Sequence, residues 1–442
     1  MTYKIKKLDS SEDNYSDFVN NHNESLLYHS LPYINLISSL TDSTNTTLIA
    51  LDSKDTILAV LPMLTKNGPY GDVDNSLPFY GSNGGILSDD LSAQKELIKF
   101  YNKNVSSKAS STVVENPISS SGSLDFSWNY QDHRIGQFTD LDLDTSSPDE
   151  LMAIFHQKTR NMVRKAQKEG IEVLEQNDEI EYLAEMHREN IAAVNGIAKK
   201  KEFFEKIPNY FKAGEDYKIF LASYNKSPIA ALLLFYFNET VEYFTPVVNS
   251  LHRDKQPLSL LIFEAMQQAS ASGYRRWNWG GTWPSQEGVH RFKKRWGTYD
   301  KNYLYKTQLN NLDILNASQN ELLSAYENFF VLPFDQLNVN TNGEIFILEM
   351  GESIFITELA KKMIALSGKN GEDIKIEFTG LRKGEKINEK LFFDNEVVSK
   401  TSIKGILSTN SKLLIPTVVE FNKLISLIEN DEEKIEFLKS IG

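Results

Sequence analysis

Cations and aromatic side chains alternate in one short stretch of the chain, residues 277–297. This stretch, WNWGGTWPSQEGVHRFKKRWG, holds four of the five tryptophans. Aromatic faces and cations together bind bases, sugars or phosphorylated groups through stacking, cation–π contacts and charge-assisted hydrogen bonds. Single-stranded nucleic acid suits the same pattern, and some of the tryptophans must lie in the core. We expect a substrate cleft here, with binding residues Trp279, Gly280, Gly281, His290, Arg291 and Lys294.

A second group of cations lies on a predicted helix between Ser147 and Gly170. Arg160, Arg164 and Lys168 are spaced i, i+4 and i+8, so they line one stripe of that helix. Like charges at this spacing repel each other unless an anion faces them. The alternatives are a solvated basic face and an anion-binding surface, and both stay open, with the three cations as candidate binding residues. The apolar face of the same helix is formed by Leu151, Phe155, Met162 and Ala166.

Strand patterns over 240–247 and 275–281 flank a helix that begins at Pro257 and ends at Gly273. A strand, a helix and a strand in this order predict a βαβ unit with parallel strands. The turn before the helix is LHRDKQPLS, residues 251–259. Because helix N-termini carry free N–H groups, Arg253, Lys255 and Ser259 are candidate phosphate ligands. No glycine-rich phosphate loop accompanies them.

The chain has no cysteine, and its seven histidines lack metal-ligand spacing, so no metal site is predicted. Nucleophile-elbow and GxGxxG motifs are absent as well. The chemistry that remains needs only a bound donor and acceptor, with an oxyanion donor and one base. Aminolysis of a thioester or an aminoacyl ester is such a reaction. Glu242 and Glu287 are the candidate bases.

The length, net charge and apolar patterning of the chain limit the class of protein that the sequence can encode. The 442 residues correspond to roughly three domains. A net charge of −13 argues against broad nucleic-acid binding. With no signal-peptide pattern and no apolar run of about 20 residues, we expect a cytoplasmic protein without a transmembrane segment. The sequence predicts a β-hairpin over 46–64, an irregular Ser-rich stretch over 106–123 and an Asn-rich linker around 310–340.

Several motifs, in order, resemble the FemAB-like branch of the GNAT acyltransferases over about residues 20–305. They are LPFYGSNGG (77–85), KTRNMVRKAQKEGIEV (158–173), PLSLL (257–261), WGG (279–281) and GVHRFKKRWG (288–297). The resemblance implies two GNAT-like subdomains. It places the acyl donor between the two strands of the βαβ unit, with its pyrophosphate at the helix start. The usual donor loop motif is absent, so acyl-CoA and aminoacyl-tRNA both stay open as donors.

The tail carries its own resemblance. Residues 343–395, with a predicted helix at 353–368 and the motif GLRKGEK, are similar to the C-terminal part of nucleoside-diphosphate-sugar epimerases and 4,6-dehydratases of polysaccharide synthesis. The catalytic half of those enzymes has no counterpart here. The resemblance implies a nucleotide-sugar contact through Arg382, or a docking remnant. A further helix pattern covers 416–440.

Taken together, the sequence predicts an α/β (α+β) protein. Its parts are two GNAT-like subdomains with mixed sheets flanked by helices (1–145 and 146–308), a linker (309–340) and a small C-terminal α/β domain (341–442). The predicted activity joins an acyl or aminoacyl group from acetyl-CoA or another acyl-CoA to a nucleotide-linked amino sugar in bacterial surface-polysaccharide synthesis. Sugar-nucleotide dehydratases or aminotransferases are candidate partners, and DNA is not. The alternatives are an aminoacyl-tRNA-dependent peptidoglycan bridge ligase and a non-catalytic subunit that binds a nucleotide sugar.

Overall fold

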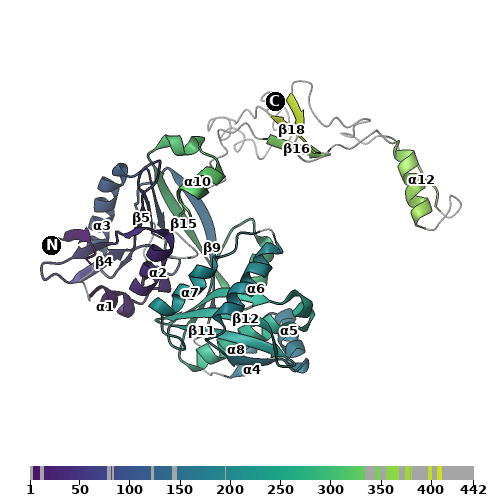
Figure 1. Ribbon diagram of the computed structural model, residues 1–442, viewed down its shortest axis with the longest axis horizontal. Coiled ribbons are helices and arrows are strands. Elements are labelled where there is room, and N and C mark those ends of the chain that lie inside the picture. The colour runs from purple at the N-terminus through teal and green to yellow at the C-terminus, as the bar shows by residue number, and fades with distance from the viewer. Residues whose placement is uncertain are drawn as a thin grey trace. The chain divides into compact units, whose positions relative to one another are not determined.

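The computed structural model describes nearly all of the chain up to residue 333 and shorter parts beyond it (Figure 1). The chain separates into two compact units, Met1–Phe334 and Asp335–Gly442, and each is described by itself. The described residues are 3–9, 14–76, 81, 84–120, 124–141, 147–194, 196–333, 344–348, 355–367, 374–378, 380, 397–400 and 406–410.

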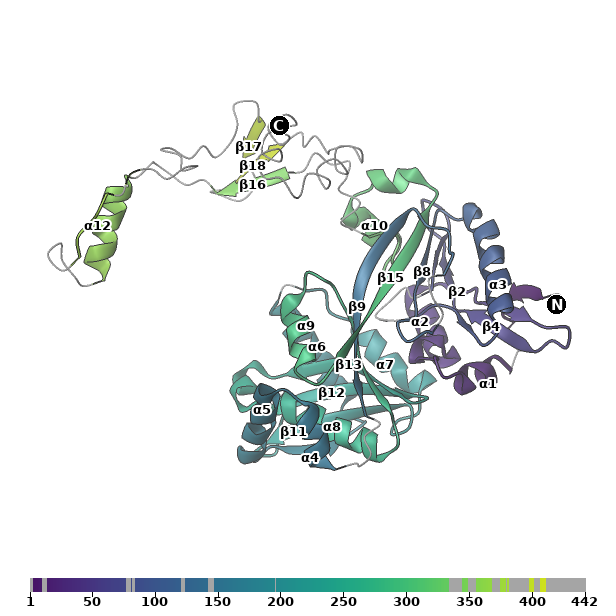
Figure 2. The same ribbon diagram turned by 180° about the vertical axis from the view of Figure 1, so that it is seen from behind.

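One mixed sheet of eleven strands runs through the first unit, in the order β10-β11-β12-β13-β14-β9-β15-β8-β6-β5-β2. Figure 2 shows β9 and β15 as long curved strands that connect the two lobes of this unit. The two predicted subdomains therefore share a continuous backbone ladder, and the predicted boundary between residues 145 and 146 stays a prediction. The strands are β2 (Thr44–Asn45), β5 (Leu64–Lys66), β6 (Val73–Asn75), β8 (Ser110–Val114), β9 (Tyr130–Asp140), β10 (Glu172–Glu175), β11 (Tyr217–Tyr224), β12 (Ser227–Phe237), β13 (Thr240–Val248), β14 (Arg276–Thr282) and β15 (Tyr299–Leu309).

A second sheet of the first unit has the order β1-β3-β4-β7. Strands β3 and β4 pair antiparallel, which confirms the predicted hairpin. Helix α3 packs on this sheet through Leu97, Ile98 and Tyr101. Mixed sheets with flanking helices confirm the predicted fold class. The elements are β1 (Lys4–Lys7), β3 (Leu48–Leu51), β4 (Ile57–Leu61), β7 (Leu87–Ser88), α1 (Asn14–Asn21), α2 (Leu31–Thr41) and α3 (Leu91–Asn104).

The Ser-rich stretch predicted to be irregular contains a buried strand, so that prediction is wrong for β8. All five residues of β8 are buried between β6 and β15. Their hydroxyl groups have partners: Ser110 Oγ donates to the Val331 carbonyl at 2.5 Å, and Thr112 Oγ1 lies 2.8 Å from Thr307 Oγ1. A buried hydroxyl costs little free energy when it is hydrogen-bonded, so composition alone misjudges this strand.

The single helix predicted between Ser147 and Gly170 is two helices, α4 (Pro148–Ile154) and α5 (Gln157–Lys168). Phe155 has extended backbone between them, and its buried ring packs edge-on against two core aromatic rings. His156 begins α5, and its Nδ1 accepts a hydrogen bond from the backbone N–H of Lys158. The predicted stripe of cations lies entirely on α5, so the break leaves it intact.

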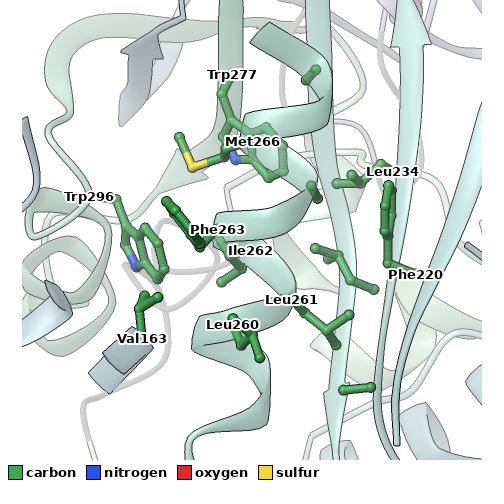
Figure 3. Close-up of a cluster of buried hydrophobic side chains, with 14 of the residues drawn as sticks. Val163, Phe220, Leu234, Leu260, Leu261, Ile262, Phe263, Met266, Trp277 and Trp296 are labelled. Atoms are coloured by element: carbon green, nitrogen blue, oxygen red, sulfur yellow. The ribbon is translucent and has the colours of Figure 1, made fainter. Parts of the chain in front are cut away.

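The predicted βαβ unit is confirmed by β13, α8 (Pro257–Ala271) and β14, because β13 and β14 pair in parallel. Figure 3 shows the core that α8 forms with the sheet, in which Met266 lies near Trp277 and Leu261 and Ile262 lie further along the helix. Full burial of each such aliphatic side chain contributes about 1.5–3 kcal/mol. The remaining helices of this lobe are α6 (Ile180–Ala192), α7 (Lys201–Tyr210) and α9 (Glu287–Lys294).

Residues 309–333 differ from the predicted linker, because they pack onto the first unit. Helix α10 (Gln319–Ala325) begins with a capping box at Ser318 and is followed by the buried side chain of Tyr326. The Tyr326 hydroxyl donates to the Gly71 carbonyl at 2.8 Å. These contacts fix the segment against the N-terminal lobe.

In the second unit, the described strands form one antiparallel sheet in the order β16-β18-β17. They are β16 (Glu344–Leu348), β17 (Val397–Lys400) and β18 (Ile406–Asn410). Helix α12 (Ile356–Leu366) lies within the helix predicted at 353–368. The helix predicted at 416–440 lies outside the described residues.

Gly297 offers a test of the packing between the α4–α5 break and the end of α9. It has φ = +75°, and a Cβ atom there would lie 2.9 Å from the Ile154 carbonyl oxygen. Gly170 has a similar φ of +73° but open space around it. We expect Gly170→Ala to cost about 1–2 kcal/mol from backbone strain alone, and Gly297→Ala to cost clearly more. Urea unfolding of both variants measures their free energies of unfolding. Equal losses of stability in the two variants would contradict the close contact between Gly297 and Ile154.

Candidate functional site

Strands β13 and β14 diverge in the middle of the βαβ unit. They pair only from Thr240 with Arg276 to Glu242 with Asn278. Beyond this point β14 continues along β9, and β13 continues along β12. Helix α8 follows the end of β13, so its N-terminus faces the edge where the strands have separated. In a parallel unit, this is the position that binds anionic ligands.

A β-bulge lies in β13 just beyond the point of divergence. Leu233 of β12 pairs with Thr245, whereas Leu234 pairs with Tyr243, so Phe244 is the extra residue. A bulge leaves its extra residue outside the regular ladder. Backbone N–H groups beside the diverging strands are thereby available to an oxygen atom of a ligand.

Glu242 lies where the two strands part, and its carboxyl group is buried. The Tyr28 hydroxyl donates to Oε2 at 3.0 Å, and Asn278 Nδ2 donates to Oε1 at 3.1 Å. Burial raises the pKa of Glu242 to about 7, against the lowering effect of these two hydrogen bonds. A carboxyl group with a pKa near neutrality is suited to proton transfer.

At the start of α8, the structure separates the predicted phosphate ligands. Arg253 is exposed in the turn before the helix. Lys255 forms an ion pair with Glu169 of 2.7 Å and lies over the Tyr224 ring, so its charge is already partnered. Ser259 is buried in the first turn of α8. Of the three predicted ligands, Arg253 is therefore the one most accessible to a phosphate group.

The ion pair between Lys255 and Glu169 also fixes the end of α5 near the start of α8. Arg164 and Lys168 are exposed on α5, and neither forms an ion pair within the described part of the chain. Arg160 is half-buried, and its Nη1 donates to the Phe155 carbonyl at 3.1 Å. The structure therefore brings two accessible cations of the predicted stripe close to the N-terminus of α8.

The tryptophans predicted to line a cleft are mostly core residues. Trp277, Trp279 and Trp296 are buried. Figure 3 shows Trp277 and Trp296 packed around α8. Trp279 Nε1 donates to Thr139 Oγ1 at 2.9 Å, inside the same cluster. Of these three, only Trp279 is a predicted binding residue, and its burial places it in the core instead of a cleft; Trp283, which is 39% exposed, differs from them.

Lys293 of α9 is a buried cation that the sequence did not single out. Its Nζ donates to Thr282 Oγ1 at 2.8 Å and to the carbonyls of Gly280 and Gly281 at 3.3 and 3.4 Å. Burial lowers the pKa of Lys293 to about 8. The Gly280 N–H in turn donates to Asn278 Oδ1 at 2.9 Å. Gly280 and Gly281, referred to below as the glycine pair, therefore connect Lys293 through Asn278 with the hydrogen bonds around Glu242.

The exposed face of α9 brings four predicted residues together. Ile135, Pro284, Glu287, His290, Arg291 and Lys294 line a shallow hollow of about 330 Å³. His290 Nε2 lies 3.0 Å and Lys294 Nζ 3.5 Å from the Asp300 carboxylate. Glu287 is exposed and lies 3.9 Å from Arg291, far less enclosed than Glu242. Of the two candidate bases, Glu242 therefore has the environment suited to proton transfer.

Tyr28 and Asn278 were also missed by sequence reasoning. Asn278 had a signal, since it is a polar residue between two tryptophans in an apolar strand. Tyr28 had none, because it lies 214 residues from Glu242. Arg382, the predicted nucleotide-sugar ligand of the tail, lies outside the described residues. Within the described residues, no three acidic or histidine side chains gather into a metal site, and no helix is long and apolar enough to cross a membrane.

Comparison with known proteins gives two family matches. A family described as an acetyltransferase (GNAT) domain matches residues 155–294. A family described as a polysaccharide biosynthesis protein matches residues 330–411. The first match contains α5, the βαβ unit and α9, whereas Tyr28, Ile135, Thr139 and Asp300 lie outside it.

Two curated relatives match the tail. The capsular polysaccharide biosynthesis protein CapD of Staphylococcus aureus is 54% identical over 97 residues, which are 22% of this chain and 16% of CapD. The probable polysaccharide biosynthesis protein EpsC of Bacillus subtilis (strain 168) is 54% identical over 54 residues, 12% of this chain and 9% of EpsC. The chain thus spans less than a fifth of the length of either relative.

Among solved structures, the crystal structure of FemX is similar to this chain, with a TM-score of 0.54 and 15% sequence identity. The similarity covers 71% of this chain and 100% of the FemX chain, and it shows a common fold. Both parts of the predicted resemblance are confirmed: the chain carries an acyltransferase domain of the GNAT type with a FemX-like fold, followed by a segment of a polysaccharide biosynthesis family.

Proposed function

We propose that this protein transfers an acyl group from acyl-CoA to the amine of a nucleotide-linked amino sugar in bacterial surface-polysaccharide synthesis. The observation that carries the proposal is the divergence of β13 and β14 beside a buried carboxyl group with a pKa near 7. GNAT acyltransferases use acyl-CoA donors. The polysaccharide segment of the tail supports a sugar as the acceptor.

The donor lies between the diverging strands in this proposal. Its pyrophosphate faces the N-terminus of α8, where free N–H groups and the exposed Arg253 favour negative charge. Arg164 and Lys168 of α5 supply two further cations beside this end. The acyl carbonyl lies at the β-bulge around Phe244, where backbone N–H groups stabilise the developing oxyanion.

The reaction is an aminolysis of the thioester. The amine nitrogen of the sugar attacks the carbonyl carbon, so that a carbon–nitrogen bond forms and the carbon–sulfur bond breaks. The proton lost by the amine passes to the Glu242 carboxylate, directly or through the Tyr28 hydroxyl, which donates to that carboxylate. The departing CoA thiolate takes up a proton in return. Lys293 holds the glycine pair beside Asn278 and so keeps this part of β14 in place.

Donor binding tests the cationic stripe. We expect calorimetric titration with acetyl-CoA to give saturable binding at one site. Arg164→Ala removes a charge-assisted contact and should weaken the binding about tenfold, which corresponds to roughly 1.4 kcal/mol. Arg188→Ala, which removes an exposed cation paired with Glu185 on α6, is the matched control and should bind as the wild type does. Absence of binding, with group transfer that ribonuclease abolishes, would point to an aminoacyl-tRNA donor.

The dependence of the rate on pH tests the base. Since the Glu242 carboxyl must lose its proton to act, kcat/KM should rise with pH through about 7. Glu242→Gln should lower the rate at least a hundredfold and remove this rise, whereas Glu287→Gln should keep it. If the rise persists in the Glu242 variant, another group is the base.

The same raised pKa predicts a change in stability. The pKa of the carboxyl is about 7 in the folded protein against 4.5 ordinarily, so the folded state binds the proton more tightly. The resulting stability is fully present below about pH 4.5 and is lost as pH rises through about 7. Urea unfolding at pH 5 and at pH 8 measures this change. Between these two pH values, the free energy of unfolding should fall further for the wild type than for Glu242→Gln, by up to about 3 kcal/mol. Equal losses would mean that Glu242 is not protonated on folding.

A further inference from the structure

We propose that a pocket of the N-terminal lobe binds a sugar ring, at a site separate from the one proposed for acyl transfer. The pocket has a volume of about 250 Å³ and lies between the end of α3 and strands of both sheets of this lobe. None of the described residues that line it belongs to β13, α8 or β14, which form the proposed donor site. We refer to it as the α3 pocket, and its lining includes Leu48, Met63, Thr65, Asp74, Phe100 and Lys108.

The apolar part of this lining is already formed. Leu48, Met63 and Tyr101 line the pocket and are buried. The Tyr101 hydroxyl lies 2.7 Å from Ser111 Oγ, so this ring is held in place. Phe100, its neighbour on α3, is 36% exposed and lines the same pocket. Binding pockets for small molecules are mostly apolar with a few polar groups that fix orientation, and the C–H face of a sugar ring can pack on such a surface.

The polar part of the lining is a chain of hydroxyl groups that ends at a carboxylate. Thr46 Oγ1 lies 2.8 Å from Thr65 Oγ1, which in turn donates to Asp74 Oδ1 at 2.6 Å. Lys108 Nζ lies 3.1 Å from the same Oδ1 atom. The second oxygen of this carboxylate, Oδ2, forms no hydrogen bond within the part of the chain that the structure describes. It can therefore accept a hydrogen bond from a hydroxyl group of a ligand.

The charges around the pocket favour an uncharged ligand. Lys108 Nζ is paired with both Asp74 and Asp72, at 3.1 and 3.3 Å. An anionic ligand would have to displace one of these carboxylates, and an ammonium ligand would compete with Lys108 for them. Lys7, the other cation of the described lining, is exposed to solvent. Burial raises the pKa of Asp74 against the effect of Thr65 and Lys108, so one more hydrogen-bond donor would stabilise the charged carboxylate.

A sugar ring combines the properties that this lining requires. It carries no charge, one of its faces consists of C–H groups, and the hydroxyl groups around its edge both donate and accept hydrogen bonds. One hydroxyl can donate to Asp74 Oδ2. Because an ammonium group has three donors, Lys108 can bind an oxygen of the same ring and keep both of its carboxylates.

The size of the pocket favours one ring over a chain of sugars. Its volume of about 250 Å³ lies below the range of about 300–1,000 Å³ that is typical of pockets for larger ligands. Asn104 and Ser107 also line the pocket and are exposed, so its opening lies near the end of α3. A ring bound there can be a free sugar or the last residue of a glycan that extends into solvent.

The test is a ligand-observed NMR titration of the purified full chain with the methyl β-glycosides of glucose, galactose and N-acetylglucosamine. We expect saturable binding of at least one glycoside. Phe100→Ala removes an exposed ring without disturbing the core and should weaken this binding at least fivefold. Asp74→Asn removes the carboxylate and should weaken it at least tenfold, because the charge-assisted hydrogen bond to the sugar is lost.

Two matched controls separate the pocket from its surroundings. Asp72→Asn removes the other carboxylate beside Lys108, and Asp72 is absent from the lining, so the glycoside should bind as it does to the wild type. Leu91→Ala removes an exposed apolar side chain at the opposite end of α3 and should also leave the binding unchanged. Equal weakening by Asp72→Asn and Asp74→Asn would overturn the inference, because the effect would then come from the charge of Lys108 and not from a contact in the pocket.

Three further outcomes would also overturn the inference. They are no binding of any glycoside, glycoside binding that Phe100→Ala and Asp74→Asn leave unchanged, and binding of inorganic phosphate or glycine in place of the glycosides. A disaccharide with the bound sugar at its nonreducing end distinguishes the sources, since it should bind as the monosaccharide does if the pocket holds the end of a glycan. Acetyl-CoA binding should be unchanged in all four variants, so this inference and the proposed function fail separately.

Discussion

The Glu242 carboxyl group lies where the parallel strands β13 and β14 of the large sheet part, and much of the candidate site is arranged around its burial. An isolated buried carboxylate is costly, so the fold supplies Tyr28 from the N-terminal lobe and Asn278 from the neighbouring strand as hydrogen-bond donors. Burial nevertheless dominates and keeps the pKa near 7. The contact with Tyr28 also means that the environment of this carboxyl depends on how the N-terminal lobe packs against the βαβ unit.

Asn278 extends this constraint along β14. Its side chain donates to Glu242 and accepts from the Gly280 N–H, while Lys293 binds the carbonyls of Gly280 and Gly281. The pairing of β14 with β9 shifts its register between Asn278 and Gly281, and Gly280 has φ = +73°. A residue with a Cβ atom would be strained in this conformation. The irregular backbone, the buried lysine and the buried carboxyl thus form one connected network.

The fold could be predicted from the sequence wherever periodicity and local signals agree. The hairpin of β3 and β4 and the parallel βαβ unit followed from apolar patterns and from Pro257. Strand β8 could not be predicted in this way, because its serines and threonines become compatible with burial only through partners such as Val331 and Thr307, far along the chain. Local composition carries no information about such partners.

The candidate site shows the same distinction between residues that local patterns identify and residues that only the packing of distant segments can assign. The cations of α5 could be found from their spacing, since a helix places residues three and four apart on one face, and those of α9 from their alternation with aromatic residues. The tryptophans could not be assigned, because a core and a cleft require the same residue type, and only packing against α8 separates Trp277 and Trp296 from the exposed Trp283. Because Trp277 and Trp296 belong to the core, the stretch 277–297 has a buried side and an exposed side. Its buried side stabilises the sheet that holds Glu242, and its other side presents Glu287, Arg291 and Lys294 to solvent. The alternation of aromatic and basic residues therefore follows from one short helix, which packs into the core on one side and carries charged side chains on the other.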